Sequence, residues 1–140
     1  MERITQADIA TRIGLSPMTV YRASLCVGRG EAPLTDDVAL YLLVASEFRD
    51  LGMAWPVAVQ LVARFRDEVS FVSFDPEVRR SWIVSIARED GTRFQMAAVS
   101  ESHLANIVDS RSRAEVLALH GPVARAVDEL AALKARKAVA

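Results

Sequence analysis

The side chains in this sequence that are best suited to binding chemistry can contact DNA, and they gather within residues 16–22. An arginine can bind guanine through two hydrogen bonds or hold a phosphate, hydroxyl groups can donate to phosphates, and a methionine can contact a thymine methyl group. Helical spacing that turns Val20 and Ala23 inward turns most of these side chains outward. Arg12 and Arg29 lie nearby in the sequence and are candidates for contacts with the DNA backbone. The candidates within the segment are Ser16, Met18, Thr19, Tyr21 and Arg22.

No comparable grouping predicts catalysis or a metal site. A single cysteine, Cys26, excludes an intramolecular disulfide and leaves no Cys-x-x-Cys pair for zinc. His103 and His120 do not have the spacing of a zinc-binding helix, and the sequence contains no Walker loop, dinucleotide-binding glycine motif or nucleophile elbow. We therefore expect no catalytic residue, no metal and no cofactor, and we do not expect an enzyme.

The composition indicates a folded chain without a membrane span. Its 140 residues are 51% hydrophobic and 25% charged, which favours one domain, or a small module with an accessory element, around a buried core. The 17 basic and 18 acidic residues exclude a uniformly basic coat. The longest apolar run, residues 38–45, is far shorter than the roughly 20 residues that a membrane helix requires. The N-terminal residues do not resemble a secretory signal, so we expect a cytoplasmic, nucleoid-associated protein.

Capping residues and glycines divide the first half of the chain into four expected helices. Thr5 with Asp8 resembles a capping box, and Gly14 is expected to end the helix that they start. Ser16 followed by Pro17 is expected to begin a second helix, because serine is a good N-cap and proline is tolerated at the first helical position. The helices are predicted over about residues 6–13, 17–25, 35–51 and 56–67, with a turn or short hairpin over 26–34.

The pattern changes after Asp67. Residues 69–74 are rich in β-prone side chains and are expected to form an extended bridge. Asp90-Gly91 between two β-prone runs is a strong hairpin signal, and it predicts antiparallel strands over 81–87 and 93–99. A short helix is expected over about residues 100–109. Ser112 and Glu115 form a capping box that is expected to start another helix. After an interruption at Gly121-Pro122, a last helix is expected to reach about Lys137.

The segment over residues 6–25 meets the demands of a helix-turn-helix. Such a motif needs a tight turn, small and apolar residues where the two helices touch, and an exposed face on the second helix. Ala10 permits a close approach and Gly14 permits the turn. Residues 1–30 contain four arginines against two acidic residues, a net charge of +2, whereas residues 31–67 contain three arginines against six acidic residues, a net charge of −3. This distribution favours DNA binding by the first segment.

Residues 4–22, followed by a short glycine-containing turn and then residues 48–62, resemble the winged-helix DNA-binding domain of MerR-type regulators. The resemblance covers about residues 3–66, and Leu51-Gly52-Met53 is similar to the leucine-glycine-phenylalanine junction of that family. It implies that residues 26–34 are the wing and that Thr19, Tyr21 and Arg22 lie on the recognition helix. Residues 32–35 depart from the tyrosine-arginine pair that the family wing usually carries, so Arg29 is the candidate for the wing's phosphate contact. Nothing after Asp67 resembles the coiled coil or effector domain of the family.

The expected fold class is α+β, mainly α. A winged helix-turn-helix of four short helices over residues 1–67 is expected to precede a β-hairpin and helical element over residues 68–140. We expect the second part to supply dimerisation, with protein docking or small-ligand sensing as alternatives. One face of its last helix carries an apolar stripe that is expected to pack in the core, although pairing with another subunit stays open: Val123, Val127, Leu130 and Leu133.

These expectations predict a sequence-specific DNA-binding transcriptional regulator of bacterial or phage type. One helix-turn-helix makes few base contacts, so we expect a homodimer that reads a two-fold operator in double-stranded DNA with the helix over residues 17–25. The alternative is a phage-type DNA packaging or recombination accessory protein, resembling a small terminase subunit or an excisionase, that uses the same winged helix. A protein partner bound through residues 68–140 is compatible with both.

Overall fold

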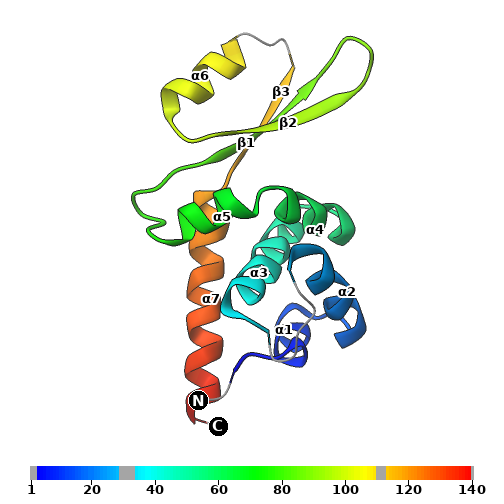
Figure 1. The fold of residues 1–140 in the computed structure, drawn as a ribbon, viewed down its shortest axis with the longest axis vertical. Coiled ribbons are helices and arrows are strands. Elements are labelled where there is room, and N and C mark those ends of the chain that lie inside the picture. The colour runs from blue at the N-terminus through cyan, green and yellow to red at the C-terminus, as the bar shows by residue number, and fades with distance from the viewer. Residues whose placement is uncertain (1–2, 29–33, 110–112, 140) are drawn as a thin grey trace.

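The computed structural model describes residues 3–28, 34–109 and 113–139 (Figure 1). Within these residues the protein is mainly helical with one small antiparallel sheet, which confirms the α+β class, mainly α. The sheet lies at one end of the molecule with α6, and α7 runs from the sheet to the other end. None of the described helices combines the length and apolar character needed to cross a bilayer. The elements in chain order are α1 (Gln6–Ile13), α2 (Pro17–Val27), α3 (Asp36–Asp50), α4 (Trp55–Arg64), α5 (Arg66–Ser73), β1 (Trp82–Ala87), β2 (Arg93–Ala98), α6 (Glu101–Asp109), β3 (Ala114–Ala118) and α7 (His120–Val139).

Local hydrogen bonds explain why α1 forms where the sequence predicts it. The Thr5 hydroxyl accepts from the Asp8 backbone N–H at 3.2 Å, and the Asp8 carboxylate accepts from the Thr5 N–H at 2.8 Å. These two bonds complete the predicted capping box. Gly14 ends the helix with a φ of 74°, a left-handed conformation that favours glycine.

α2 begins as predicted but is longer than expected. The Ser16 hydroxyl accepts from the Thr19 backbone N–H at 3.1 Å, and Pro17 occupies the first helical position. Because α2 continues to Val27, the first two residues of the turn predicted over 26–34 are helical instead. Residues 29–33 lie outside the described residues, so the wing stays a prediction.

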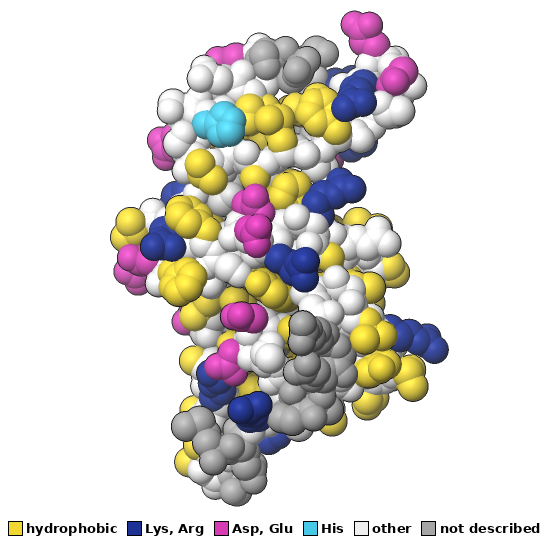
Figure 2. All heavy atoms as spheres, in the orientation of Figure 1, with side chains coloured by type: hydrophobic (Ala, Val, Ile, Leu, Met, Phe, Trp, Pro, Cys, Tyr) yellow, Lys and Arg dark blue, Asp and Glu magenta, His cyan; other side chains and the backbone are white. Residues whose placement is uncertain are grey.

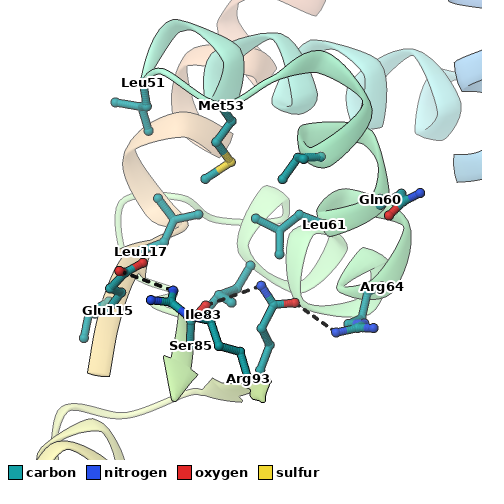
Figure 3. Close-up of a pocket in the computed structure, with 13 residues that line it drawn as sticks. Leu51, Met53, Gln60, Leu61, Arg64, Ile83, Ser85, Arg93, Glu115 and Leu117 are labelled. Carbon is teal, nitrogen blue, oxygen red and sulfur yellow. Dashed lines mark hydrogen bonds and ion pairs between the residues drawn. The ribbon is translucent and has the colours of Figure 1, made fainter. Parts of the chain in front are cut away.

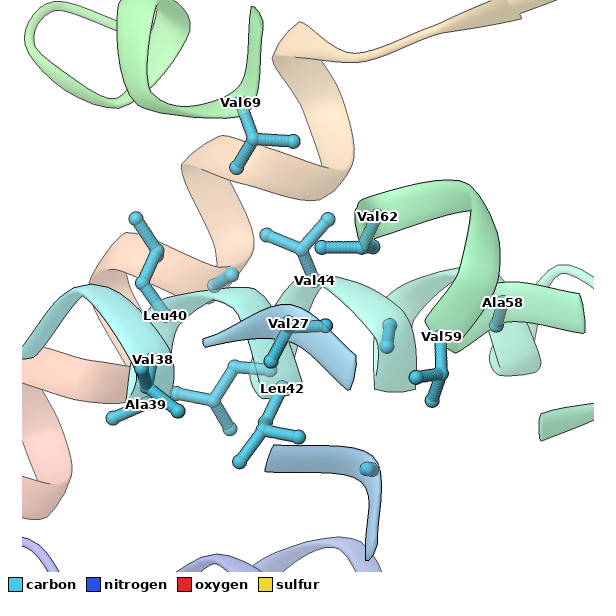
Figure 4. Close-up of a cluster of buried hydrophobic side chains, with 14 of the residues drawn as sticks. Val27, Val38, Ala39, Leu40, Leu42, Val44, Ala58, Val59, Val62 and Val69 are labelled. Atoms are coloured by element: carbon cyan, nitrogen blue, oxygen red, sulfur yellow. The ribbon is translucent and has the colours of Figure 1, made fainter. Parts of the chain in front are cut away.

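α3 is the centre of the helical core (Figure 4). It packs against α1, α2, α4, α5 and α7. Phe48, near its C-terminal end, is the largest of the completely buried side chains. The helix predicted over 56–67 is divided, because α4 ends at Arg64 and α5 begins at Arg66. Buried valines from the surrounding helices converge on α3: Val27, Val62 and Val69.

α5 corrects the prediction of an extended bridge over residues 69–74. Val69 and Val72 are completely buried, and their three-residue spacing places both on one helical face. That face packs toward α3 and α7. β propensity largely reflects how a side chain packs on a pleated surface, so burial of this valine pair against helices overrides it.

The predicted hairpin is confirmed, and it belongs to a three-stranded sheet of order β2-β1-β3. β1 pairs antiparallel with both neighbours, with Ser85 opposite Gln95 on one side and Glu115 on the other. The helix expected after Ser112 and Glu115 is wrong, because Glu115 lies in β3; Ser112 itself lies outside the described residues. If residues 114–118 formed a helix, the backbone N–H and C=O groups on one edge of β1 would have no strand to pair with. As β3, these residues provide those hydrogen-bond partners. α6 packs on one face of the sheet, and Ile83 from the opposite face joins the helical core.

α7 brings the second half of the chain back onto the first. It starts at His120, so the interruption predicted at Gly121-Pro122 is the first turn of the helix, where proline is tolerated. Its packing along α3 places side chains from both sides of residue 67 in one apolar core. The predicted apolar stripe packs in this core, which confirms the core interpretation: Val123, Val127, Leu130 and Leu133.

Ion pairs fasten α7 to α1 and α3. At its C-terminal end, the Lys137 ammonium contacts the Asp8 carboxylate and donates to the backbone carbonyl of Arg3 at 2.8 Å. Nearer the middle of α7, the Glu129 carboxylate accepts hydrogen bonds from both Nε and Nη2 of Arg12. The pairs are Asp8–Lys137, Arg12–Glu129, Asp36–Lys134 and Glu47–Arg125.

Two of these carboxyl groups make the docking of α7 depend on pH. Hydrogen bonds from Arg12 lower the pKa of Glu129 below its usual value of 4.5. For Asp8, burial favours the neutral form, but hydrogen bonds from Lys137 and Thr5 outweigh it and lower the pKa below 3.8. A carboxyl whose pKa is lowered by folding stabilises the folded state above its unfolded pKa and stops doing so as the pH falls through its folded pKa. The contributions are therefore complete above about pH 4.5 and decline below it.

We expect Glu129→Gln to lower the free energy of unfolding at pH 7 by about 1 kcal/mol or less, because the pair is partly exposed. The difference from the wild type should shrink as the pH falls below 4.5. Urea unfolding at neutral and acid pH measures it. Glu89→Gln is the matched control, because Glu89 is exposed on the hairpin turn. A difference that is equal at both pH values would contradict the assigned role of the ion pair.

Candidate nucleic-acid interface

One face of α2 is exposed along most of the helix. The side chains on it follow each other at spacings of three and four residues, which is one stripe of a helix. Its apolar members are well exposed, with exposed fractions of 57% for Met18 and 53% for Leu25. The stripe consists of Met18, Tyr21, Arg22 and Leu25, and we call it the α2 stripe.

The opposite face of α2 holds the helix in place. Val20, Ala23 and Val27 are buried against α1, α3 and α4, as the sequence predicts for the first two. Ser24 is also buried, and its hydroxyl donates to the Tyr21 carbonyl at 2.6 Å, so its polar group is satisfied within the helix. At the end of α2, Arg66 donates to the Val27 carbonyl at 3.1 Å. The α2 stripe is thus presented by a helix that is packed on its other side.

The N-terminal end of α2 carries no neutralising carboxylate. Its first turn contains no acidic residue, and none occurs elsewhere in the helix. The Ser16 hydroxyl caps the Thr19 N–H and lies 2.8 Å from the Thr19 hydroxyl, so these two predicted contact residues form the helix start together. The positive end of the helix dipole is therefore uncompensated by a side-chain charge within α2.

The predicted arginines differ in their surroundings. Arg22 is exposed on the α2 stripe and makes no hydrogen bond or ion pair with any described residue. Arg12 lies on α1 and faces α7, where its contact with Glu129 raises its own pKa. A phosphate contact by Arg12 would have to compete with that carboxylate. Arg29 lies outside the described residues.

The structure thus brings together some of the predicted contact residues and separates others. Met18, Tyr21 and Arg22 share one exposed stripe, and Ser16 and Thr19 lie at the start of the same helix. Sequence reasoning missed Leu25, because the helix was expected to end there. The seven-residue spacing from Met18 to Leu25 is the signal that could have found it.

The face of the molecule shown in Figure 2 is mixed in charge. On the face shown in Figure 2, acidic and basic side chains alternate with apolar ones, and no uniformly basic area is visible there. This agrees with a net charge of −1 and means that a DNA contact would have to be local. No group of three or more metal-binding side chains is assembled within residues 3–28, 34–109 and 113–139.

Comparison with protein-family models, with curated proteins and with solved structures found no match to this chain. The resemblance to MerR-type regulators therefore stays a prediction that depends on the residues themselves. The geometry of α2 is the remaining basis for a functional proposal.

Proposed function

We propose that this chain is a sequence-specific DNA-binding transcriptional regulator in which α1, the turn at Gly14 and α2 act as a helix-turn-helix. In this proposal α2 is the recognition helix. The observation that carries the proposal is the α2 stripe, an exposed face with an unpaired arginine on a helix whose other face is buried.

The chemistry of the α2 stripe suits a DNA groove. None of the guanidinium N–H groups of Arg22 is bound to a described residue, so all of them can donate to DNA. Tyr21 adds a hydroxyl group, and Met18 and Leu25 offer apolar contacts. The absence of acidic side chains from α2 removes the repulsion that phosphates would otherwise meet. An uncompensated helix N-terminus adds a weak attraction for phosphate.

The length of the stripe supports a dimer. Met18 and Leu25 are seven positions apart in the helix, so the stripe spans about 10 Å. At about 3.4 Å per base pair this reaches only about three base pairs, too few for a specific site. Two copies on half-sites one helical turn apart would double the contacts, so a two-fold operator is the target that we propose.

Selection of the purified protein on a random duplex library, followed by sequencing and footprinting, tests the proposal. We expect an enriched inverted repeat with half-site centres about one turn apart. Binding of the selected duplex should exceed binding of a scrambled duplex at both low and moderate salt. Loss of all binding with salt and no enriched motif would overturn the proposal. A continuous footprint without half-sites would favour a packaging or recombination accessory role.

Arg22→Ala should weaken binding of the selected duplex by about 1–3 kcal/mol if Arg22 contacts a base. The reason is the loss of a bidentate contact, and titration with fluorescent duplexes measures it. Arg88→Ala is the matched control, because Arg88 is exposed in the turn between β1 and β2, at the sheet end of the molecule and away from α1 and α2. Equal weakening on selected and scrambled DNA would instead make Arg22 a phosphate contact.

A further inference from the structure

A cleft of about 620 Å³ lies between α4 and the sheet (Figure 3). Its size is typical of small-molecule sites, which occupy roughly 300–1,000 Å³. One wall comes from α4 and the preceding Leu51-Gly52-Met53 junction, and the other comes from all three strands. The cleft plays no part in the proposed DNA contact.

The strand pattern explains why the sheet wall is polar on one side and apolar on the other. Side chains two residues apart on a strand share a face, and residues paired across strands form rows. Ile83 pairs with Ala97 and Leu117, which gives an apolar row against the helical core. The next row on the same face consists of Gln95, Ser85 and Glu115. Polar groups therefore line the cleft beside an apolar base.

Hydrogen bonds hold the polar row in one arrangement. The Gln95 side-chain amide donates to the Ser85 hydroxyl at 3.3 Å, and its carbonyl accepts from Nη1 of Arg64 at 3.0 Å. Arg93 lies 3.3 Å from the Glu115 carboxylate. Figure 3 draws these contacts as dashed lines: the bond to Arg64 joins the sheet to the end of α4, and the others join neighbouring strands. Arg64 thus has one fixed contact, and its other N–H groups remain available to a ligand.

The charge balance of the cleft favours an anion. The charged side chains among its lining residues are two arginines, Arg64 and Arg93, and one carboxylate, Glu115. Glu115 is already paired with Arg93, so Arg64 is the charge without a carboxylate partner. The planar guanidinium matches a carboxylate through two parallel hydrogen bonds.

The helix wall supplies the apolar half of the site. Leu51 and Val57 are each 57% exposed, although both are large apolar residues. Met53 and Leu61 lie deeper between them and the sheet, and the Met53 side chain points toward the cleft (Figure 3). A ligand with an apolar body would cover this surface, and methionine adapts readily to different apolar shapes.

We propose that this cleft binds a small monocarboxylic acid with an apolar body. Its carboxylate lies against Arg64 and Gln60 at the polar side, and its apolar body lies over Met53, Leu61 and Ile83. A simple inorganic anion would leave the apolar wall uncovered, and an amine would face the unpaired guanidinium.

The test uses octanoate as the probe on the full chain without DNA, so its result is independent of the proposed DNA binding. Binding is measured by calorimetry and by NMR shifts of backbone amides. Octanamide, octylamine and acetate are the neutral, cationic and short controls. We expect octanoate to bind with shifts confined to the cleft, and the three controls to bind at least about tenfold more weakly, since charge-assisted hydrogen bonds and apolar contact are both required.

Two variants locate the charge recognition. Arg64→Gln should weaken octanoate binding by about tenfold or more, whereas Arg136→Gln, far from the cleft, should not. Gln60→Glu adds a carboxylate of nearly the same shape, so it should weaken octanoate and strengthen octylamine. Circular dichroism checks that each variant is folded. No octanoate binding at millimolar concentration, equal binding of octanoate and octylamine, or shifts outside the cleft would each overturn the proposal.

Discussion

Phe48→Ala is expected to lower the free energy of unfolding by about 3–5 kcal/mol. Phe48 is 0% exposed at the end of α3, where the helical core surrounds it. Removing the ring loses its burial and leaves a cavity that the packed helices fill only in part. Urea unfolding followed by circular dichroism measures the change.

Phe74→Ala is the matched control for this substitution. Phe74 follows α5 and is 79% exposed, so the same change in chemistry removes little buried surface. We expect a change within about 0.5 kcal/mol. Similar losses for the two variants would contradict the placement of Phe48 in the core.

Ala126→Asp should destabilise the protein by about 3–5 kcal/mol at neutral pH, because it buries a charge without a partner. Ala126 is 0% exposed on the face of α7 that packs along α3. The introduced carboxylate would have to be desolvated, or α7 would have to leave α3. Chemical unfolding measures the loss, and limited proteolysis reports whether α7 is released.

Ala131→Asp makes the same change on the exposed side of the same helix. It should alter stability by no more than about 0.5 kcal/mol. If the two aspartates had equal effects, α7 would not be docked on the first half of the chain as described.

The local parts of the fold were predictable from the sequence. Thr5 and Asp8 bond to each other three residues apart, and Gly14 adopts the left-handed conformation that glycine favours. The turn of the hairpin is also determined locally, because Gly91 has a φ of 85°, a left-handed conformation that favours glycine. In each case the determining contacts lie within a few residues, so the residue types alone suffice.

The elements that depend on distant partners were not predictable. Val69 and Val72 form a helix because α3 and α7 cover them, and Glu115 lies in a strand because β1 is beside it. Their local sequences are compatible with the states that we expected instead. The partner that decides between the states lies far away in the chain.

The candidate DNA contact shows the same division. The exposure of Met18, Tyr21 and Arg22 followed from helical spacing within α2. The partner of Arg12 did not, because Glu129 lies 117 residues away. The cleft beside α4 was missed for the same reason, because its two walls, a helix and a sheet, come from parts of the chain that are far apart in the sequence.

The return of α7 onto α3 also has a consequence for synthesis on the ribosome. The ion pairs between the two helices join residues as far apart as 98 positions, with the sheet and α6 made in between. Until α7 has emerged, the side of α3 that it covers is open to solvent on the growing chain. During that interval the nascent chain presents an uncovered apolar surface, on which chaperone binding and aggregation compete with folding.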